Sequence, residues 1–147
     1  MGYINYWLRE PPEDEGIALD PDGRILIARR PKNKPHPLLW EFPGGKIEDG
    51  ETPEKTIARE LREELNVDPC ESCLQPFSFV SHSYEKYNIL MVLYICRQWD
   101  GFAKACEGQI LKWVFPDKLE DYELVAADIP LAKELRDRLP VGKRFLK

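Results

Sequence analysis

The chain has 147 residues, a net charge of -5 and 43% hydrophobic residues, which suits one globular domain spanning residues 1–147. No apolar stretch approaches the length of a membrane span, and the first residues lack a signal-peptide pattern, so no membrane partner and a cytoplasmic location are expected. The acidic balance argues against a stable nucleic-acid-binding surface. It does not argue against a phosphate ligand, because metal ions can supply the local positive charge.

The first third of the chain predicts short strands separated by turns. Residues 1–15 contain aromatic residues without a clear period, two prolines and an acidic run, so this N-terminal segment is expected to be irregular. Only Gly16 to Leu19 qualifies as an apolar first strand. The Asp-Pro-Asp-Gly turn signal at 20–23 leads into residues 24–30, which alternate as a half-buried strand. A Pro- and Lys-rich loop over 31–37 follows.

A helix is predicted from Pro53 to about Leu65, because nothing in this stretch breaks a helix and its residues favour one. Thr52 is expected to be the N-cap, and Glu54 lies in the positively polarised first turn. At about 100° per residue, one arc of this helix is apolar and predicts the buried face. That arc contains Ile57, Ala58, Leu61 and Leu65.

Three carboxylates, Glu60, Glu63 and Glu64, share a neighbouring arc of the same helix. Arg59 can reach Glu63, but one arginine cannot balance three glutamates. Like charges this close destabilise a helix, and a hard divalent cation such as Mg²⁺ or Mn²⁺ removes that cost because it binds carboxylate oxygens. The pattern therefore predicts a metal site, with a solvated acidic helix face as the alternative.

The second half of the chain predicts a hairpin, another strand and a final helix. Residues 74–83 and 88–97 are strand-like, and 88–96 is so apolar that a central strand covered on both faces is expected. A loop over 100–108 carries Glu107. The remaining expected elements are a strand over 109–115, a helical turn over 116–122, a helix over 129–139 capped by Asp128, and a basic tail over 140–147. This order predicts an α/β/α sandwich with a mixed sheet.

The four cysteines do not predict a zinc site. Cys70 and Cys73 could form half of one, but Cys96 and Cys106 have poor spacing for the other half. Free reduced thiols are therefore expected. The chain has two histidines, and no nucleophile motif surrounds a serine or cysteine, so covalent catalysis is not expected.

The spacing G-x5-E-x7-R-E-L-x-E-E-x-N-V, from Gly45 to Val67, resembles the signature of the Nudix hydrolases. Asn66 stands where that family has glycine, in a position past the helix end that requires a left-handed backbone. Asparagine is the next best residue for that conformation. The resemblance implies the Nudix fold and hydrolysis of a phosphoanhydride bond.

Residues 40–54 and 59–65 further resemble the MutT subgroup. This resemblance implies an Mg²⁺-dependent enzyme (Mn²⁺ is possible) that converts a nucleoside triphosphate, typically 8-oxo-dGTP, to the monophosphate and pyrophosphate. The expected partner is this small nucleotide, and the protein is expected to be a monomer or weak homodimer. The alternatives are a Nudix hydrolase of CTP and related pyrimidines, of a dinucleoside polyphosphate or of a sugar nucleotide, and a non-catalytic module that senses a nucleotide.

The resemblance also implies roles for individual residues. Metal binding and catalysis would involve the Gly44 carbonyl, Arg59, Glu60, Glu63, Glu64 and Glu107, the last in a Glu-Gly-Gln segment; which carboxylate is the general base stays open. Nucleotide binding would involve Arg30, Phe42, Lys46, Lys86 and Asp128, the last reading the base. For Asp128 the simpler alternative is a helix cap, and for Lys86 it is an exposed lysine.

Overall fold

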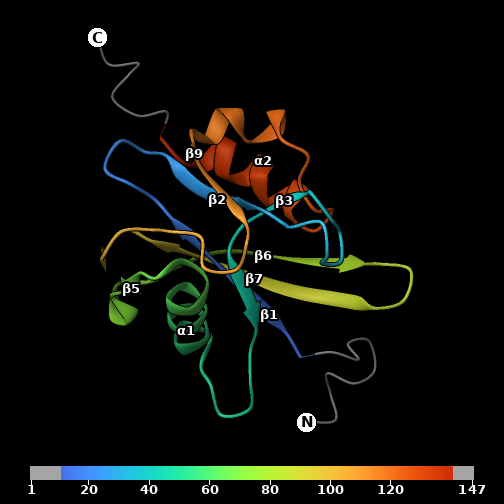
Figure 1. The fold of residues 1–147 in the computed structure, drawn as a ribbon, viewed down its shortest axis with the longest axis horizontal. Helices are drawn as coiled ribbons and strands as arrows, with labels where there is room; N and C mark the ends of the chain where they lie inside the picture. Colours follow the sequence, from blue (N-terminus) through green and yellow to red (C-terminus); the bar gives the residue numbers. More distant parts are fainter. Residues whose placement is uncertain (1–10, 141–147) are drawn as a thin grey trace.

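Two helices lie on opposite sides of the strands in the computed structural model, which describes residues 11–140 (Figure 1). The helices are α1 (Pro53–Leu65) and α2 (Asp128–Arg138), and the short 3₁₀ helices are η2 (Glu71–Cys73) and η3 (Pro116–Asp121). The strands are β1 (Glu13–Ala18), β2 (Ile25–Arg29), β3 (Trp40–Glu41), β4 (Gly44–Lys46), β5 (Asp68–Pro69), β6 (Gln75–Ser83), β7 (Asn88–Cys96), β8 (Trp99–Asp100) and β9 (Ile110–Val114). The predicted α/β/α arrangement is confirmed.

The strands form a four-stranded sheet in the order β4-β1-β7-β6, a three-stranded sheet in the order β3-β2-β9, and the pair β5-β8. Strand β1 is parallel to β7 and antiparallel to β4, so the first sheet is mixed, as predicted. Strands β6 and β7 form the predicted antiparallel hairpin. No helix within residues 11–140 is both long and apolar enough to cross a membrane.

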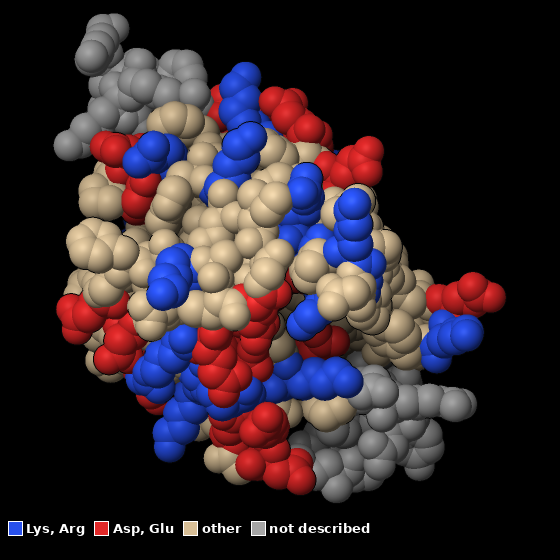
Figure 2. Space-filling model, in the orientation of Figure 1, with Lys and Arg blue, Asp and Glu red and all other residues tan. Residues whose placement is uncertain are grey.

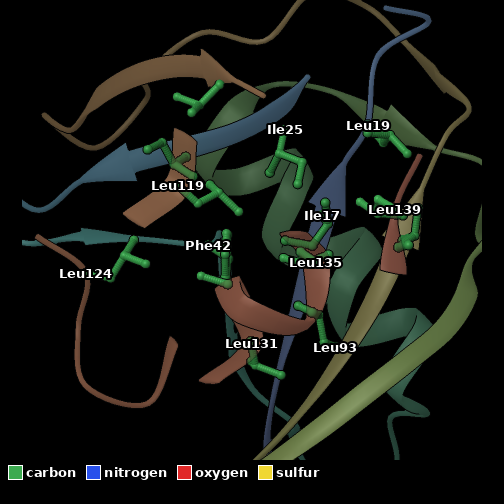
Figure 3. Packing of buried hydrophobic residues seen from close by; sticks show 14 of the residues in the cluster. Ile17, Leu19, Ile25, Phe42, Leu93, Leu119, Leu124, Leu131, Leu135 and Leu139 are labelled. Carbon is green, nitrogen blue, oxygen red and sulfur yellow. The ribbon is translucent and has the colours of Figure 1, made fainter. Parts of the chain in front are cut away.

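Apolar side chains fill the space on both sides of the strands. On the α2 side, Ile17 of β1 and Leu93 of β7 pack with Leu131 and Leu135 (Figure 3). On the α1 side, Ala18 of the same first strand joins a second cluster. The second cluster also contains Leu26, Ile57, Leu61 and Leu65. The predicted buried faces of both helices are confirmed, because their leucines are at most 8% exposed, Leu139 included.

Helix α1 begins and ends where local chemistry predicts. The Thr52 hydroxyl accepts a hydrogen bond from the Lys55 N–H at 3.2 Å, which caps the first turn. Asn66 has φ 58° and its N–H donates to the Arg62 carbonyl at 3.1 Å. Asparagine therefore fills the left-handed position that the sequence assigned to it.

Strand β1 starts earlier than predicted. Glu13 already pairs with Lys46 of β4 and with Met91 of β7, so the last residues of the expected irregular segment belong to a strand. Gly44 and Gly45 lie in strand β4. Residues 1–10 and 141–147, which include the start of the N-terminal segment and most of the predicted tail, lie outside the described residues.

Two other expectations were wrong. Strand β7 was expected to be covered on both faces. It lies inside its sheet, but its residues alternate between buried and half-buried, because α1 packs mainly on β1, β4 and β5. Cys70 and Cys73 form a disulfide, whereas Cys96 and Cys106 are free. The one-turn helix η2 brings the two Cα atoms to 5.2 Å, a separation that permits the bond.

Candidate active site

A cavity of about 310 Å³ opens where β1, β4, α1 and the loops before β9 and α2 meet. One group of lining residues is acidic or glycine: Glu13, Asp14, Glu15, Glu41, Gly44, Gly45, Glu64 and Glu107. A second group is largely aromatic and apolar: His36, Phe42, Tyr84, Tyr87, Ile89, Met91, Val125 and Ala127. Arg30 and Lys34 supply positive charge. The cavity is thus lined by acidic, basic and aromatic or apolar side chains.

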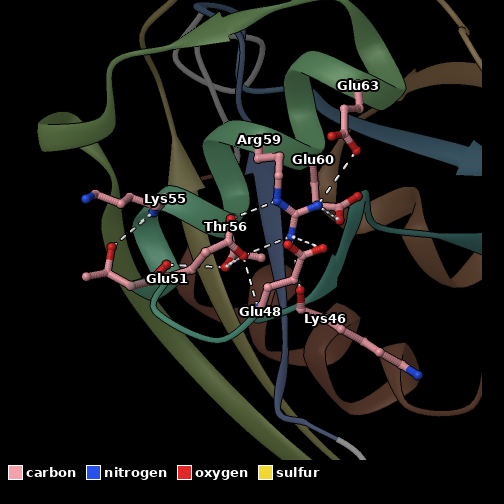
Figure 4. A network of polar contacts seen from close by, with 9 residues as sticks. Lys46, Glu48, Glu51, Lys55, Thr56, Arg59, Glu60 and Glu63 are labelled. Carbon is pink, nitrogen blue, oxygen red and sulfur yellow. Dashed lines mark hydrogen bonds and ion pairs between the residues drawn. The ribbon is translucent and has the colours of Figure 1, made fainter.

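Arg59 is the centre of the acidic helix face (Figure 4). Its Nε donates to Glu51 Oε2 at 2.8 Å and its Nη1 donates to Glu60 Oε1 at 2.7 Å, while the Glu63 carboxylate lies 3.7 Å away. The hydrogen bond from Arg59 lowers the pKa of Glu51 to about 2. Arg59 therefore holds two carboxylates in fixed positions and partly balances a third.

Arg59 is one positive charge beside Glu60 and Glu63 on the acidic helix face, and Figure 2 shows acidic side chains over α1 with Lys and Arg side chains among them. Burial, reinforced by Glu60, raises the pKa of Glu64 to about 9. Burial, again reinforced by Glu60, raises the pKa of Asp14 to about 8. Both Asp14 carboxylate oxygens are buried and have no hydrogen-bond partner among the described residues. Such a cluster fits a divalent cation, which binds carboxylate oxygens and removes their mutual repulsion.

These carboxylates do not yet form a complete ligand set. Within residues 11–140, no three His, Cys, Asp or Glu side chains are arranged together as metal ligands. Glu60 is turned toward Arg59, and the Glu63 side chain is 57% exposed and does not line the cavity. Glu64 lines the cavity directly. The structure thus brings the predicted residues to one region, where Glu60 and Glu64 are partly buried and Glu63 is exposed.

The two glycines of β4 allow the close packing of this region. A Cβ on Gly44 would lie 2.0 Å from the Asp14 carbonyl oxygen, and a Cβ on Gly45 would lie 2.5 Å from Glu60 Oε1. A side chain at either position would displace the strand or the carboxylate. Gly44 therefore stands close to β1, and Gly45 leaves room for the Glu60 carboxylate beside the cavity.

The loop before β9 is attached to the end of α1 and brings Glu107 to the cavity, as predicted. The Cys106 N–H and the Gln109 side-chain amide both donate to the Glu64 carbonyl oxygen, at 3.0 and 2.9 Å. Gln109 also accepts a hydrogen bond from the Glu107 N–H at 2.7 Å. Gln109 is therefore a positioning residue that sequence reasoning did not single out, although it ends the Glu-Gly-Gln segment.

The predicted nucleotide-binding residues are only partly brought together. Arg30 and Phe42 line the cavity, and Arg30 donates to both oxygens of Glu41 at 2.8 and 2.9 Å. Lys46 and Lys86 are exposed and do not line it. The Lys46 side chain extends away from the carboxylates in Figure 4, and Lys86 lies at the turn of the β6–β7 hairpin. The geometry does not support their predicted contacts with the nucleotide.

Asp128 is the first residue of α2 and does not cap the helix, which was the simpler alternative. Its Oδ2 instead accepts a hydrogen bond from the Phe42 N–H at 3.1 Å, and its side chain is fully buried. Burial raises the pKa of Asp128 to about 7, although hydrogen bonds from Glu15 and Phe42 oppose the rise. The aspartate therefore points into the protein beside a cavity-lining segment.

Glu15 is a buried acid that sequence reasoning missed. It is 4% exposed and lines the cavity, and its carboxyl group neighbours that of Asp128. Burial, followed by the charge of Asp128, raises the pKa of Glu15 well above its ordinary value. Glu15 lies two residues before Ile17, and alternation along a strand would have placed both on one face. The strand had been expected to start at Gly16, so that signal was not used.

Comparison with known proteins matches residues 16–135 to the NUDIX domain family. The "CTP pyrophosphohydrolase" of Escherichia coli K12 is 37% identical over 115 residues, covering 77% of this chain and 82% of that protein. The "8-oxo-dGTP diphosphatase" of the same organism is 31% identical over 121 residues, covering 82% and 92%. A solved MutT from a study of Aliivibrio salmonicida and Vibrio cholerae is similar with a TM-score of 0.76 at 30% identity, covering 89% of this chain and 100% of that one.

The family match covers most of the chain, and the solved MutT has the same fold at 30% sequence identity. The match includes helix α1 with its carboxylates, the Glu107 loop and most of α2. The acidic helix face, the glycine strand beside it and these similarities lead to one conclusion. The chain belongs to the Nudix hydrolase family.

Proposed function

We propose that this protein is an Mg²⁺-dependent nucleoside triphosphate pyrophosphohydrolase that converts 8-oxo-dGTP to 8-oxo-dGMP and pyrophosphate. The observation that carries the proposal is the cavity, which joins Glu64 and Glu107 to an aromatic pocket that the buried Glu15 also lines. A nucleoside triphosphate has the matching parts, a metal-bound polyphosphate and a flat base with hydrogen-bond donors. The relatives named for 8-oxo-dGTP support the choice of base.

The metal would be held by Glu60, Glu63, Glu64 and Glu107, with a carbonyl contributed by Gly44. When bound, Mg²⁺ neutralises phosphate oxygens and makes a bound water easier to deprotonate. Arg59 is a positioning residue in this proposal, because its hydrogen bonds fix Glu60 and Glu51. The pH profiles of variants in which these glutamates are replaced one at a time would identify the carboxylate that accepts the proton of the attacking water.

The remaining residues of the cavity would hold the nucleotide. Arg30 and Lys34 face the cavity with positive charge and suit phosphate oxygens. Phe42 offers an apolar surface for the base, and Asp128 accepts hydrogen bonds from its N–H groups. Attack of water on the β-phosphorus would release the nucleoside monophosphate and pyrophosphate.

A second candidate is a pyrophosphohydrolase of CTP. It is favoured by the 37% identity to the protein named for that activity. Cytosine also carries an amino group that can donate a hydrogen bond to a buried carboxylate. Both candidates keep the same metal-binding residues, and their substrates differ in the base and in the 2′-hydroxyl of the sugar.

The experiment is a comparison of kcat/KM for Mg²⁺-dependent pyrophosphate release from 8-oxo-dGTP, dGTP, dCTP and CTP, with a dinucleoside polyphosphate and a sugar nucleotide as further substrates. A clear preference for 8-oxo-dGTP is expected. A preference for CTP would select the second candidate, and turnover of only the dinucleotide or the sugar nucleotide would reject both. Binding without turnover of any of them would indicate a nucleotide-sensing module.

A further inference from the structure

We propose that Glu15 acts with Asp128 as a two-carboxyl reader of the base, which selects bases carrying an amino group over bases that present carbonyls in its place. This inference rests on the proposed function and deepens it, because it names the residue pair and the chemical class of base. Guanine-type bases and cytosine are expected to be selected, and uracil, thymine and hypoxanthine are expected to be rejected.

The first argument is that two buried carboxyl oxygens lack hydrogen-bond partners. Glu15 and Asp128 are 4% and 0% exposed, and their carboxyl groups lie within hydrogen-bonding reach of one another. Glu15 Oε1 and Asp128 Oδ1 have no hydrogen-bond partner in the described structure. An unsatisfied buried acceptor destabilises a protein. Two such oxygens on neighbouring carboxyl groups are therefore an unusual feature for a purely structural purpose.

The second argument is where these residues lie. Glu15 lines the cavity, and Asp128 lies directly behind the lining, because Phe42 and Ala127 line the cavity and flank Asp128 in space and in sequence. The register of β1 places Glu15 opposite Gly44 and beside Leu93. The side chain thus leaves β1 on the same side as the α2 core, opposite the face on which Asp14 neighbours Glu60. The pair is separate from the acidic residues of α1.

The third argument is the shape and chemistry of the surrounding wall. The rings of Tyr84 and Tyr87 are stacked with centroids 5.0 Å apart, and Met91 adds an apolar side chain to the same lining. The Tyr84 hydroxyl accepts the Ala127 N–H at 3.2 Å, which ties this wall to the start of α2. An apolar and aromatic wall with the carboxyl group of Glu15 in the same lining suits a planar heterocycle with N–H donors.

The choice of base follows from matching the acceptor oxygens of the pair with the donor groups of each base. Oδ2 of Asp128 already accepts a hydrogen bond from the Phe42 N–H. A proton shared between the two carboxyl groups would use one further oxygen as its donor. Acceptor oxygens therefore remain whether or not the pair holds a proton. Guanine and cytosine direct amino groups at such oxygens. Uracil and thymine direct carbonyls at them, and hypoxanthine lacks the 2-amino group. A buried site with acceptors rejects a ligand that leaves them unpaired.

The test compares pairs of nucleotides that differ in this group, CTP with UTP and dGTP with dITP, by kcat/KM for pyrophosphate release. The parent should prefer the amino member of each pair by at least about tenfold, equivalent to about 1.4 kcal/mol. Glu15→Gln keeps the size of the side chain but offers an N–H group to the base. That variant should lower the preference by about tenfold, and Asp128→Asn should act in the same direction. Glu123→Gln makes the same change on an exposed loop and should leave the preference unchanged.

Two controls separate a base-reading role from a structural one. Deoxyribose 5′-triphosphate, which has no base, should be hydrolysed equally by the parent and by Glu15→Gln. If the variant is too unstable to assay, the affinities of the parent for CMP and UMP, measured by calorimetry without metal, still test the preference for the amino group.

Equal kcat/KM for both members of each pair in the parent, or equal losses on every substrate including the abasic one, would overturn the base-reading inference and leave the proposed function standing. If the parent hydrolyses no triphosphate, the proposed function fails. The CMP and UMP affinities would then decide the inference separately, with tighter CMP binding supporting it and equal binding overturning it.

Discussion

The Arg59 guanidinium binds the Glu51 carboxylate through two parallel hydrogen bonds, Nε to Oε2 at 2.8 Å and Nη2 to Oε1 at 2.9 Å. Glu51 lies in the loop before α1 and also accepts a hydrogen bond from the Glu48 N–H at 3.0 Å. The pair therefore connects the loop after β4 to the middle of the helix. The remaining Nη1 group of Arg59 is left to orient Glu60.

Arg59→Lys should lower kcat/KM by about 10- to 100-fold, the range for outer partners of metal ligands. Lysine keeps the charge but cannot form the planar two-bond pair with Glu51 while also reaching Glu60. Steady-state kinetics would measure the loss, and a thermal melt would show that the fold persists. Arg62→Lys is the matched control, because Arg62 lies on the same helix and pairs with exposed Asp68. Equal effects of both substitutions would contradict the positioning role.

Glu64→Gln should abolish metal-dependent turnover, with a fall of more than about a hundredfold, since outer-shell partners alone account for roughly 10- to 100-fold. The neutral amide removes a buried carboxylate whose pKa is raised to about 9 by burial and by Glu60. The fold should stay intact, because the substitution also removes repulsion. Mn²⁺ binding followed by electron paramagnetic resonance gives a readout independent of activity, and parental affinity for Mn²⁺ would refute the metal assignment.

The two glycines of β4 should respond differently to alanine. Gly44→Ala places a Cβ 2.0 Å from a backbone oxygen of β1, so we expect a loss of about 1–3 kcal/mol in the free energy of unfolding. Gly45→Ala meets the Glu60 carboxylate, which can move, so we expect a smaller loss of stability and weaker Mn²⁺ binding. Urea unfolding and metal titration measure the two effects, and the reverse order would show that the packing around β4 is misassigned.

Asp128→Asn should flatten the dependence of stability on pH. Burial raises the pKa of Asp128 from 3.8 to about 7, so the folded state binds more protons than the unfolded state between these values. The free energy of unfolding therefore falls as pH rises through this interval, and the contribution is lost above about pH 7. Asparagine cannot titrate, so the variant should lose less stability between pH 5 and pH 8.

Thermal melts at pH 5 and pH 8 would compare the parent with Asp128→Asn. Some slope should remain in the variant, because Glu15 faces the same position and its pKa is also raised, mainly by burial. Asp137→Asn is the control. Its carboxylate is exposed and its pKa is lowered by a hydrogen bond from Arg136, so the fall in stability toward pH 8 should persist. An unchanged slope in Asp128→Asn would show that Asp128 is not buried as described.

Local chemistry predicted the parts of the protein that depend on neighbouring residues. The limits of α1 follow from Thr52 and Asn66, whose capping roles require only the helix itself. The buried faces of both helices follow from the spacing of their leucines. The clustering of Glu64 and Glu107 depended on the family resemblance, because α1 and the loop before β9 are joined by hydrogen bonds across a long stretch of chain.

The missed features depend on contacts that no local pattern encodes. Asp14 and Glu15 read as part of an acidic run, and only the pairing of β1 with β4 and β7 buries them. Lys46 and Lys86 were assigned from the resemblance alone. Both are exposed and neither lines the cavity, although Tyr84 and Tyr87 near Lys86 do. The Cys70–Cys73 pair depends on the turn η2, which the spacing alone did not predict.

The most direct test of the proposed reaction is hydrolysis of 8-oxo-dGTP with Mg²⁺ in ¹⁸O-labelled water, followed by identification of the labelled product. We predict 8-oxo-dGMP without label and pyrophosphate carrying one labelled oxygen, because water would attack the β-phosphorus. Label in the monophosphate would contradict the site of attack. Formation of the diphosphate and orthophosphate, or no turnover although the nucleotide binds, would contradict the proposed function itself.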